Sequence, residues 1–324
     1  MQILIYGAGA IGSDLGALIS ASGENVQLLA RGAQLAALQA NGVTVEYQGQ
    51  PSFQVPVKAQ SAEECRGRFD LIFVTLKSTQ LAAAAGKPVY VEKPMARTYV
   101  ECLQMIDACK LAGVPLFVAY YRRKLPHFLK IKELLEHGDI GEIRTVHINL
   151  KQVLTPNLVS QTETNWRVIP EIAGGGYFYD LASHQLDLLD FFFGKIMHAA
   201  GFSTNQAKAY PAEDMVTGSF VFENGVMGTG NWCFTSSAAS EIDEIVIDGS
   251  KGQIRFPTFG EGAFDLLRPN QKPLHFHLEL PKHIQRPLIQ SIVEELLGKG
   301  SCPSTGITAA RTNWVLEEIV KHRI

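Results

Sequence analysis

The sequence predicts an α/β protein: a Rossmann-type, doubly wound parallel sheet followed by an α+β domain with a large open, mainly antiparallel sheet. Over the first 120 residues, short apolar runs alternate with helical patterns, as in parallel strands joined by crossover helices. After about residue 140, long alternating strands follow one another without such helices. The 324 residues, 46% hydrophobic and 19% charged, suit two globular domains.

The first domain is expected to span residues 1–120 and to bind a dinucleotide. Its apolar runs predict strands, and the longer patterns between them predict helices. The strands are expected at 2–6, 25–30, 43–47, 69–75, 87–91 and 115–119, and the helices at 10–22, 33–41, 78–85 and 98–112.

The second domain is expected to span residues 121–324 and to serve substrate binding and oligomerisation. A helix over 126–137 ends at Gly138, a helix-terminating glycine. Helices near 179–193 and 286–298 would cover one face of the sheet, and a last helix is expected at 305–321. The uncovered face predicts a homodimer or larger assembly. Strands are expected within 142–154, 215–225, 226–235, 242–249 and 252–258, with hairpin connections at 222–227 and 248–254.

Composition excludes several classes of partner. A net charge of −3 gives no electrostatic reason to expect nucleic acid or an acidic membrane. The five cysteines show no metal-ligand spacing, and their odd number argues against a disulfide framework, so we expect reduced thiols and no metal. Met1 leads directly into a buried-strand pattern and no window resembles a membrane span, which favours a cytoplasmic protein.

A glycine-rich turn follows the first strand. In Gly7-x-Gly9-x-x-Gly12, the first glycine suits a tight turn, the second lets backbone approach a pyrophosphate, and the third lets helix and strand pack closely. Ala10 and Ile11 complete the first helical turn, whose free N–H groups would face the anion. The alternative is that these glycines serve packing alone.

The end of the second strand bears on which dinucleotide is bound. NAD sites usually place a carboxylate there for the ribose 2′-OH, but this chain has Ala30 and then Arg31. A guanidinium can grip a 2′-phosphate, so the sequence favours NADP(H), with NAD possible. In the alternative interpretation Arg31 is a solvated loop residue and the site does not discriminate.

Residues 1–84 resemble the ketopantoate reductase family. The similarity is carried by "MQILIYGAGAIGSDLGALISASGENVQLLARG" and "FDLIFVTLKSTQLAAA". That family uses NADPH, and the resemblance implies that Arg31 and Lys77 contact the phosphates of the cofactor. The rest of the chain lacks the all-helical second domain of those reductases, so ketopantoate reduction is not expected.

Lys93 is expected at the carboxyl end of the fifth strand, which Pro94 terminates. Ligands of doubly wound sheets bind at that edge, where an ammonium could polarise a carbonyl or share a proton with a hydroxyl. From Gly86 nearly to its end the chain resembles the Gfo/Idh/MocA oxidoreductase family, notably in "GKPVYVEKPMARTYVECLQMIDACKLAGVPLFVAYYRR". The resemblance implies that Lys93 lies at the active site, that Glu92 belongs to the cofactor site and that the Lys–Pro bond is often cis.

A second motif, "AGGGYFYDLASHQLDLLDFFFG", places Asp180, His184 and Asp187 on one predicted helical face. The resemblance implies that Asp180 and His184 lie beside Lys93, with His184 as proton donor or acceptor and Asp180 as orienting group. Two alternatives are an exposed polar helix face and a metal site formed by the three side chains.

Arg167 and Tyr121 are the candidate substrate-binding residues. Arg167 lies just before the glycines of the second motif, and Tyr121 follows the sixth strand. Neighbouring Tyr120, Arg122, Arg123 and Trp166 are weaker candidates that also suit packing or ion pairs.

The two resemblances meet at a short junction. Between the strands ending at Thr75 and starting near Lys87 only residues 76–86 remain, the lower limit for a parallel crossover. We interpret the chain as a recombined protein, and we expect the junction to be the least protected part of the first domain in hydrogen exchange.

The predicted function is an NADP(H)-dependent oxidoreductase that moves hydride between nicotinamide and a carbinol or ketone carbon of a sugar, polyol or similar molecule. One alternative is a recombined chain that folds and binds cofactor with little or no activity, because small errors in geometry are costly. The other is a non-catalytic dimeric binding or regulatory protein of the same fold.

Overall fold

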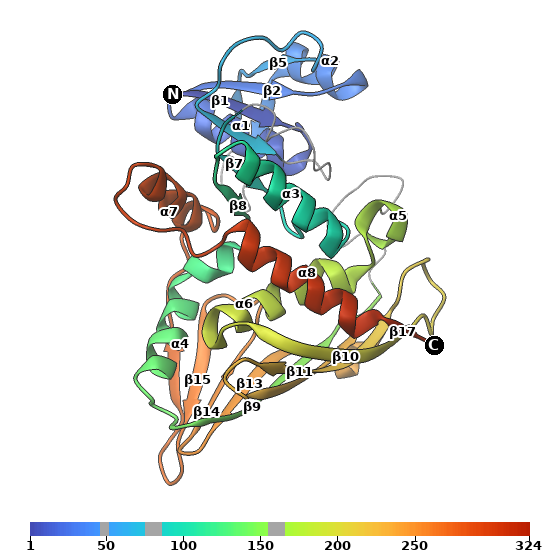
Figure 1. Cartoon of the computed structure of the whole chain (residues 1–324), viewed down its shortest axis with the longest axis vertical. Coiled ribbons are helices and arrows are strands. Elements are labelled where there is room, and N and C mark those ends of the chain that lie inside the picture. Colours follow the sequence, from blue (N-terminus) through green and yellow to red (C-terminus); the bar gives the residue numbers. More distant parts are fainter. Residues whose placement is uncertain (46–51, 75–85, 155–165) are drawn as a thin grey trace. The chain divides into compact units, whose positions relative to one another are not determined.

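The computed structural model describes residues 1–45, 52–74, 86–154 and 166–324 (Figure 1). The chain forms two compact units. The first comprises Met1–Met95 and Glu101–Ala119, and the second comprises Ala96–Val100 and Tyr120–Ile324. A short segment after Lys93 therefore belongs with the second unit although the chain then returns to the first.

The first unit is built on a six-stranded sheet in the order β5-β2-β1-β6-β7-β8, in which each strand pairs with its neighbour in parallel. Parallel strands need crossover connections, which here include helices α1 (Ala10–Ala21), α2 (Gly32–Asn41) and α3 (Tyr99–Leu111). The predicted doubly wound architecture is confirmed. The strands are β1 (Gln2–Tyr6), β2 (Asn25–Leu29), β5 (Lys58–Gln60), β6 (Leu71–Val74), β7 (Val89–Val91) and β8 (Leu116–Val118).

One predicted strand does not join this sheet. Residues 43–47 were expected as its third parallel strand, but β3 (Val43–Val45) pairs antiparallel with β4 (Phe53–Val55) in a separate two-stranded sheet. An antiparallel partner can be reached through a short connection, whereas a parallel one cannot. The edge position beside β2 is taken by β5, which the sequence did not predict.

The two parts of the chain that resemble different families share one sheet. β6 precedes the junction and β7 follows it, and they pair in parallel with Ile72 opposite Val89 and Val74 opposite Val91. Backbone hydrogen bonding thus joins the strands on either side of the junction. The predicted helix at 78–85, most of the junction and Lys77 lie outside the described residues.

The second unit is built on a nine-stranded sheet in the order β16-β15-β14-β13-β9-β12-β11-β10-β17. It is mainly antiparallel, as predicted, with parallel pairings at β9–β12 and β10–β17. Both predicted hairpins are present, and β10, β15, β16 and β17 are strands that the sequence analysis missed. The strands are β9 (Ile143–Lys151), β10 (Ile196–Thr204), β11 (Met215–Phe222), β12 (Met227–Cys233), β13 (Ile242–Gly249), β14 (Gln253–Phe256), β15 (Ala263–Leu267), β16 (Leu274–His277) and β17 (His322–Arg323).

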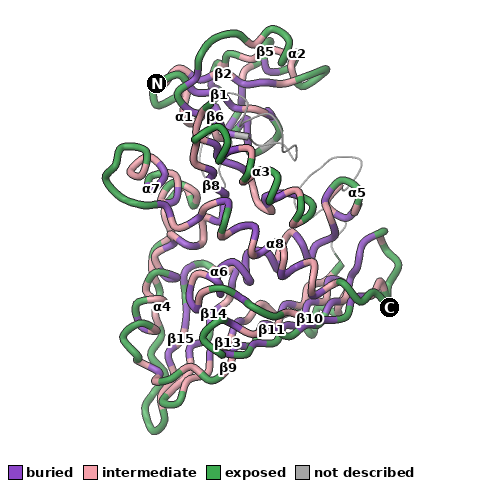
Figure 2. Tube along the Cα trace, viewed as in Figure 1, coloured by how far each residue is buried: buried purple, intermediate pink, exposed green. Residues whose placement is uncertain are grey.

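Helices cover one face of this sheet and form its core. Figure 2 shows buried backbone concentrated along α6 (Ser183–Phe193), α8 (Gly306–Val320) and the strands they cover. Trp232 is fully buried there because strand alternation turns it inward while Met227 on the same strand points outward. The remaining helical segments are α4 (Pro126–Glu136), α5 (Pro170–Ala173), α7 (Arg286–Leu296), a π-helical turn (Phe178–Ala182) and 3-10 turns at Tyr121–Lys124, Trp166–Val168 and Ala238–Ser240.

The other face of the large sheet carries exposed apolar side chains. Met227 is 62% exposed and Phe202 56% exposed. Self-association through this face stays a prediction, which sedimentation velocity would test: a monomer at all concentrations would contradict it. Among the described residues no helix is both long and apolar enough to cross a membrane.

Candidate active site

The glycine turn joins β1 to α1 at the carboxyl edge of the parallel sheet. Gly7 has φ of 112°, a conformation that favours glycine, and its N–H and that of Ala8 donate to the carbonyl of Leu29 at the end of β2. A Cβ added at Gly9 would meet no atom of the described residues within 4 Å, so packing against them does not require glycine there. α1 begins without a side-chain cap and without an acidic residue in its first turn. These features leave an open helix N-terminus suited to an anion.

Three residues that the sequence analysis did not single out shape this turn. The carbonyl of Ala8 accepts hydrogen bonds from Ser13 Oγ at 3.0 Å and Gln34 Nε2 at 2.9 Å. A Cβ on Gly16 would lie 2.9 Å from a methyl of Leu28, so Gly16 allows α1 to pack closely on β2; the same role for Gly12 stays a prediction. The signal was present in the sequence, because Gly16 follows Gly12 by four residues on the same helix face.

Arg31 lies at the same edge of the sheet as the glycine turn. It follows β2 by two residues, and Ala30 between them donates its N–H to Gln60 on β5. The side chain is exposed and makes no ion pair with any residue that the structure describes. Arg31 thus places an exposed guanidinium two residues beyond the carbonyl that holds Gly7.

Lys93 follows β7, which ends at Val91, and the Lys93–Pro94 bond is cis. The end of β7 is secured to β8 by the bond from the N–H of Ala119 to the carbonyl of Val91, at 2.9 Å. Glu92 and Lys93 are both half-buried. Because β7 lies two strands from β1 in a parallel sheet, Lys93 and the glycine turn share one edge at a lateral spacing of about 10 Å.

In the second unit, a run of three glycines allows the chain to pass close to its neighbours. Gly174 has φ of 83°, and a Cβ there would lie 2.8 Å from the carbonyl oxygen of Arg97. A Cβ on Gly176 would lie 2.6 Å from the Cβ of Ala212, and its N–H donates to Glu213 at 3.2 Å. The glycines thereby fix the position at which the helical segment carrying Asp180 begins.

Asp180 and Asp187 do not share one face of a regular helix, contrary to the prediction. Phe178–Ala182 forms a π-helical turn, so α-helical spacing does not hold across this segment. Asp187 is 1% exposed and accepts from Arg123 Nε at 2.8 Å and Nη2 at 2.7 Å. Asp187 therefore belongs to a buried ion-pair network. Within the described parts of the chain, no three His, Cys, Asp or Glu side chains form a metal-binding group.

His184 lies among aromatic rings and is 5% exposed. Its ring contacts those of Tyr120, Tyr121 and Phe259 edge-on, at centroid distances of 6.1, 5.6 and 5.9 Å. Edge-to-face packing restricts the orientation of a ring. The imidazole is therefore held in a largely water-excluded position, and Tyr121, a predicted substrate residue, forms part of its enclosure.

Arg167 and Asp180 meet in the second unit. The Arg167 Nε lies 3.4 Å from Asp180 Oδ2, and the guanidinium stacks on Trp166 at 4.6 Å from the ring centroid. Both side chains remain partly exposed, at 17% and 24%. The predicted substrate residue and the predicted orienting carboxylate thus form one partly accessible polar pair.

Arg122 is placed over the rings of Tyr121 and Phe259, at 5.1 and 4.7 Å from their centroids. Burial lowers the pKa of its guanidinium. The same two rings enclose His184, so a cation and the imidazole share an aromatic environment. Burial and the charge of Arg122 lower the pKa of His127 to about 4.

The structure thus assembles two groups of predicted residues. The glycine turn, Arg31, Glu92 and Lys93 lie at one edge of the first unit's sheet, and Tyr121, Arg167, Asp180 and His184 lie in the second unit.

Comparisons with known proteins agree with this division. Residues 3–103 match the family model "Ketopantoate reductase PanE/ApbA", and residues 128–255 match "GFO/IDH/MocA C-terminal domain". The first match extends past the expected boundary at residue 84 and includes Glu92 and Lys93.

Individual relatives resemble most of the chain. Oxidoreductase P35 of Formosa agariphila is 37% identical over 236 residues, covering 73% of this chain and 72% of that protein. The 1,5-anhydro-D-fructose reductase of Ensifer adhaerens is 26% identical over 257 residues, covering 74% and 70%. A levoglucosan dehydrogenase solved with NADH and levoglucosan shares the fold at a TM-score of 0.78 and 19% identity, covering 99% and 96%. With its C-terminal domain match and a 37% identical relative, the chain belongs to the Gfo/Idh/MocA oxidoreductase family.

Proposed function

We propose that the protein is an NADP(H)-dependent oxidoreductase that transfers hydride between nicotinamide and a carbinol or ketone carbon of a sugar or polyol. The observation that carries this proposal is the edge of the first sheet, where an open glycine turn, an exposed arginine and Lys93 lie together. Family membership supports redox chemistry, and the residues present suit it.

The residues of the glycine turn fit a dinucleotide. The space beside Gly9 and the uncapped start of α1 suit a pyrophosphate, and Gly12, Ala10 and Ile11 lie in that first helical turn. Arg31 would contact a 2′-phosphate, which is the basis for preferring NADP(H). Lys77, by its family resemblance, and Glu92 complete the proposed cofactor site. Bound nicotinamide would supply or accept the hydride.

Lys93 and His184 are proposed to manage the proton. When a carbinol is oxidised, its C–H bond breaks with both electrons leaving on the hydride, a carbonyl forms, and the hydroxyl proton passes to a base. Asp180, paired with Arg167, would orient the substrate hydroxyl or the imidazole. Tyr121 would line the substrate side, because it already packs against His184.

A sugar or polyol substrate is supported by two relatives. One is named for reducing 1,5-anhydro-D-fructose and another was solved with levoglucosan bound. Polar donors such as Arg167 suit the hydroxyl groups of such molecules, and the ring of Trp166 beside it suits their apolar faces.

The alternative is a recombined chain that binds cofactor without turnover. It is favoured by the two family matches, residues 3–103 to one family and residues 128–255 to another. Lys93 belongs to the first unit, whereas His184 and Asp180 belong to the second. Activity requires both units to present their groups to one substrate, and an error of about 1 Å can cost about 100-fold in rate.

Fluorescence titration with NADPH and NADH, followed by a screen of sugars and polyols, tests the proposal. Tighter NADPH binding and turnover that falls about 10²- to 10⁴-fold in Lys93→Ala would support it. Lys87→Ala, a lysine at the start of the same strand region, is the matched control and should retain activity. Cofactor binding with no Lys93-dependent turnover on any substrate would favour the inactive alternative.

A further inference from the structure

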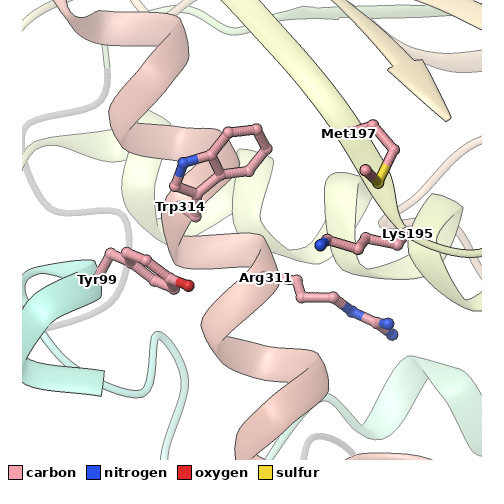
Figure 3. Close-up of a pocket in the computed structure, with 5 residues that line it drawn as sticks. All are labelled: Tyr99, Lys195, Met197, Arg311 and Trp314. Atoms are coloured by element: carbon pink, nitrogen blue, oxygen red, sulfur yellow. The ribbon is translucent and has the colours of Figure 1, made fainter. Parts of the chain in front are cut away.

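A pocket in the second unit lies among side chains that the proposed function does not use. It has a volume of about 230 Å³ and is lined by Tyr99, Lys195, Met197, Arg311 and Trp314 (Figure 3). Tyr99 begins α3, Lys195 follows α6, Met197 lies on β10, and Arg311 and Trp314 are one turn apart on α8. Three elements and the link between α6 and β10 therefore converge on it.

Among the residues that the structure describes, the lining contains two cations and no carboxylate. Lys195 is exposed and its ammonium makes no ion pair with the residues that the structure describes. Arg311 donates through Nη2 to Asp190 at 2.7 Å, and Asp190 is 5% exposed. That bond anchors the guanidinium at the pocket while Nη1 has no partner among the described residues.

Two aromatic residues add further donors. The indole N–H of Trp314 and the hydroxyl of Tyr99 make no hydrogen bond within the described chain. In Figure 3 Tyr99 and Lys195 approach from opposite sides, with Trp314 and Arg311 on the helix between them. The pocket thus combines ammonium, guanidinium, indole and phenol donors with a flat indole face and the adaptable thioether of Met197.

We propose that this pocket binds a small organic anion in which a carboxylate is attached to a flat apolar body. The carboxylate can accept charge-assisted hydrogen bonds from Lys195 and Arg311, and the flat body packs on Trp314. A neutral molecule of the same shape supplies no counter-charge to the Lys195 ammonium and no acceptor of full charge to Arg311 Nη1, and a carboxylate without the flat body makes no contact with the indole face. The site is separate from the candidate active-site residues and does not depend on the proposed reaction.

Calorimetric titration at low ionic strength tests the proposal with benzoate as probe. Benzamide has the same ring without charge, and acetate has the charge without the ring. Saturable binding of benzoate, much weaker binding of both analogues and weakening by added salt are expected. The proposal would be overturned if the wild-type protein showed no saturable binding of benzoate, or if benzamide bound as tightly as benzoate.

Two substitutions locate the binding. Lys195→Gln removes one cation from an exposed position and should weaken benzoate binding about tenfold. Lys272→Gln, at another exposed lysine of the same unit, should bind benzoate as the wild type does. Lys93→Ala should also leave benzoate binding unchanged. If benzoate binding is lost in Lys93→Ala but retained in Lys195→Gln, benzoate binds at another site and the assignment is refuted. Equal thermal midpoints show that each variant is folded.

Discussion

Arg31 and Arg123 are the same residue type in opposite circumstances. Arg31 is exposed at the edge of the first unit's sheet and has no ion-pair partner among the described residues. Arg123 is 2% exposed in the second unit and bonds Asp187, Asp190 and the carbonyl of Pro303. The first guanidinium is exposed, and the second is used by the fold. The difference lies in which acceptors the folded chain provides.

Arg123 stabilises the second unit through a buried ion-pair network with Asp187, Asp190 and Arg311. Its guanidinium joins the 3-10 turn Tyr121–Lys124 to α6 and to the loop before α8, and Arg311 also bonds Asp190. Burial acts to lower the pKa of Arg123, but Asp187 and Asp190 together outweigh it and raise that pKa above its usual value, which keeps the guanidinium charged. Removing one member of such a network leaves buried charges without compensation.

Arg123→Met is therefore expected to have the largest effect on stability. We expect a loss of about 3–5 kcal/mol in the free energy of unfolding of the second unit. Urea titration followed by tryptophan fluorescence measures it, since Trp166, Trp232 and Trp314 all lie in that unit. Adding Asp187→Leu should restore part of the loss by removing the orphaned carboxylate. A loss below about 1 kcal/mol would mean that water compensates the network.

A second contrast concerns two histidines on or next to α4. His127 is 1% exposed, and its pKa is lowered to about 4, whereas His137 is exposed. The unfolded imidazole binds a proton below about 6.5 while the folded one stays neutral until about 4. Because the unfolded state binds more protons in that interval, the contribution of His127 is present above pH 6.5 and is lost as the pH falls toward 4.

The predicted size of this contribution is about 3 kcal/mol over that interval. Buried carboxylates such as Glu213, whose pKa is raised, make the unfolding free energy change with pH in the opposite direction. The contribution of His127 is therefore measured as the difference in unfolding free energy between the wild type and His127→Gln across pH 4–7. His137→Gln is the control and should parallel the wild type. If His127→Gln also parallels the wild type, the buried imidazole titrates normally.

Much of this organisation could be predicted from local signals. The glycine turn, the strand before Lys93 and the alternation of the large sheet each depend on neighbouring residues, and all were predicted. The buried ion pair of Asp187 could not be predicted in this way, because its partner Arg123 is 64 residues away in the sequence. The π-helical turn between them also has no recognisable residue pattern. The sequence also could not predict that β5 rather than β3 pairs with β2, because both are three-residue strands whose partners depend on the rest of the fold. Local pattern identifies elements, and distant partners decide their roles.

Arg31→Ala tests the other side of the comparison and has the smallest expected effect. If its guanidinium serves a ligand, its loss should weaken NADPH binding about tenfold, leave NADH binding unchanged and leave the thermal midpoint unchanged. Arg68→Ala, at another exposed arginine of the same unit, should bind both cofactors as the wild type does. Equal weakening of NADPH and NADH would show that Arg31 acts on a group common to both cofactors. A lowered thermal midpoint would show instead that this arginine, like Arg123, is used by the fold.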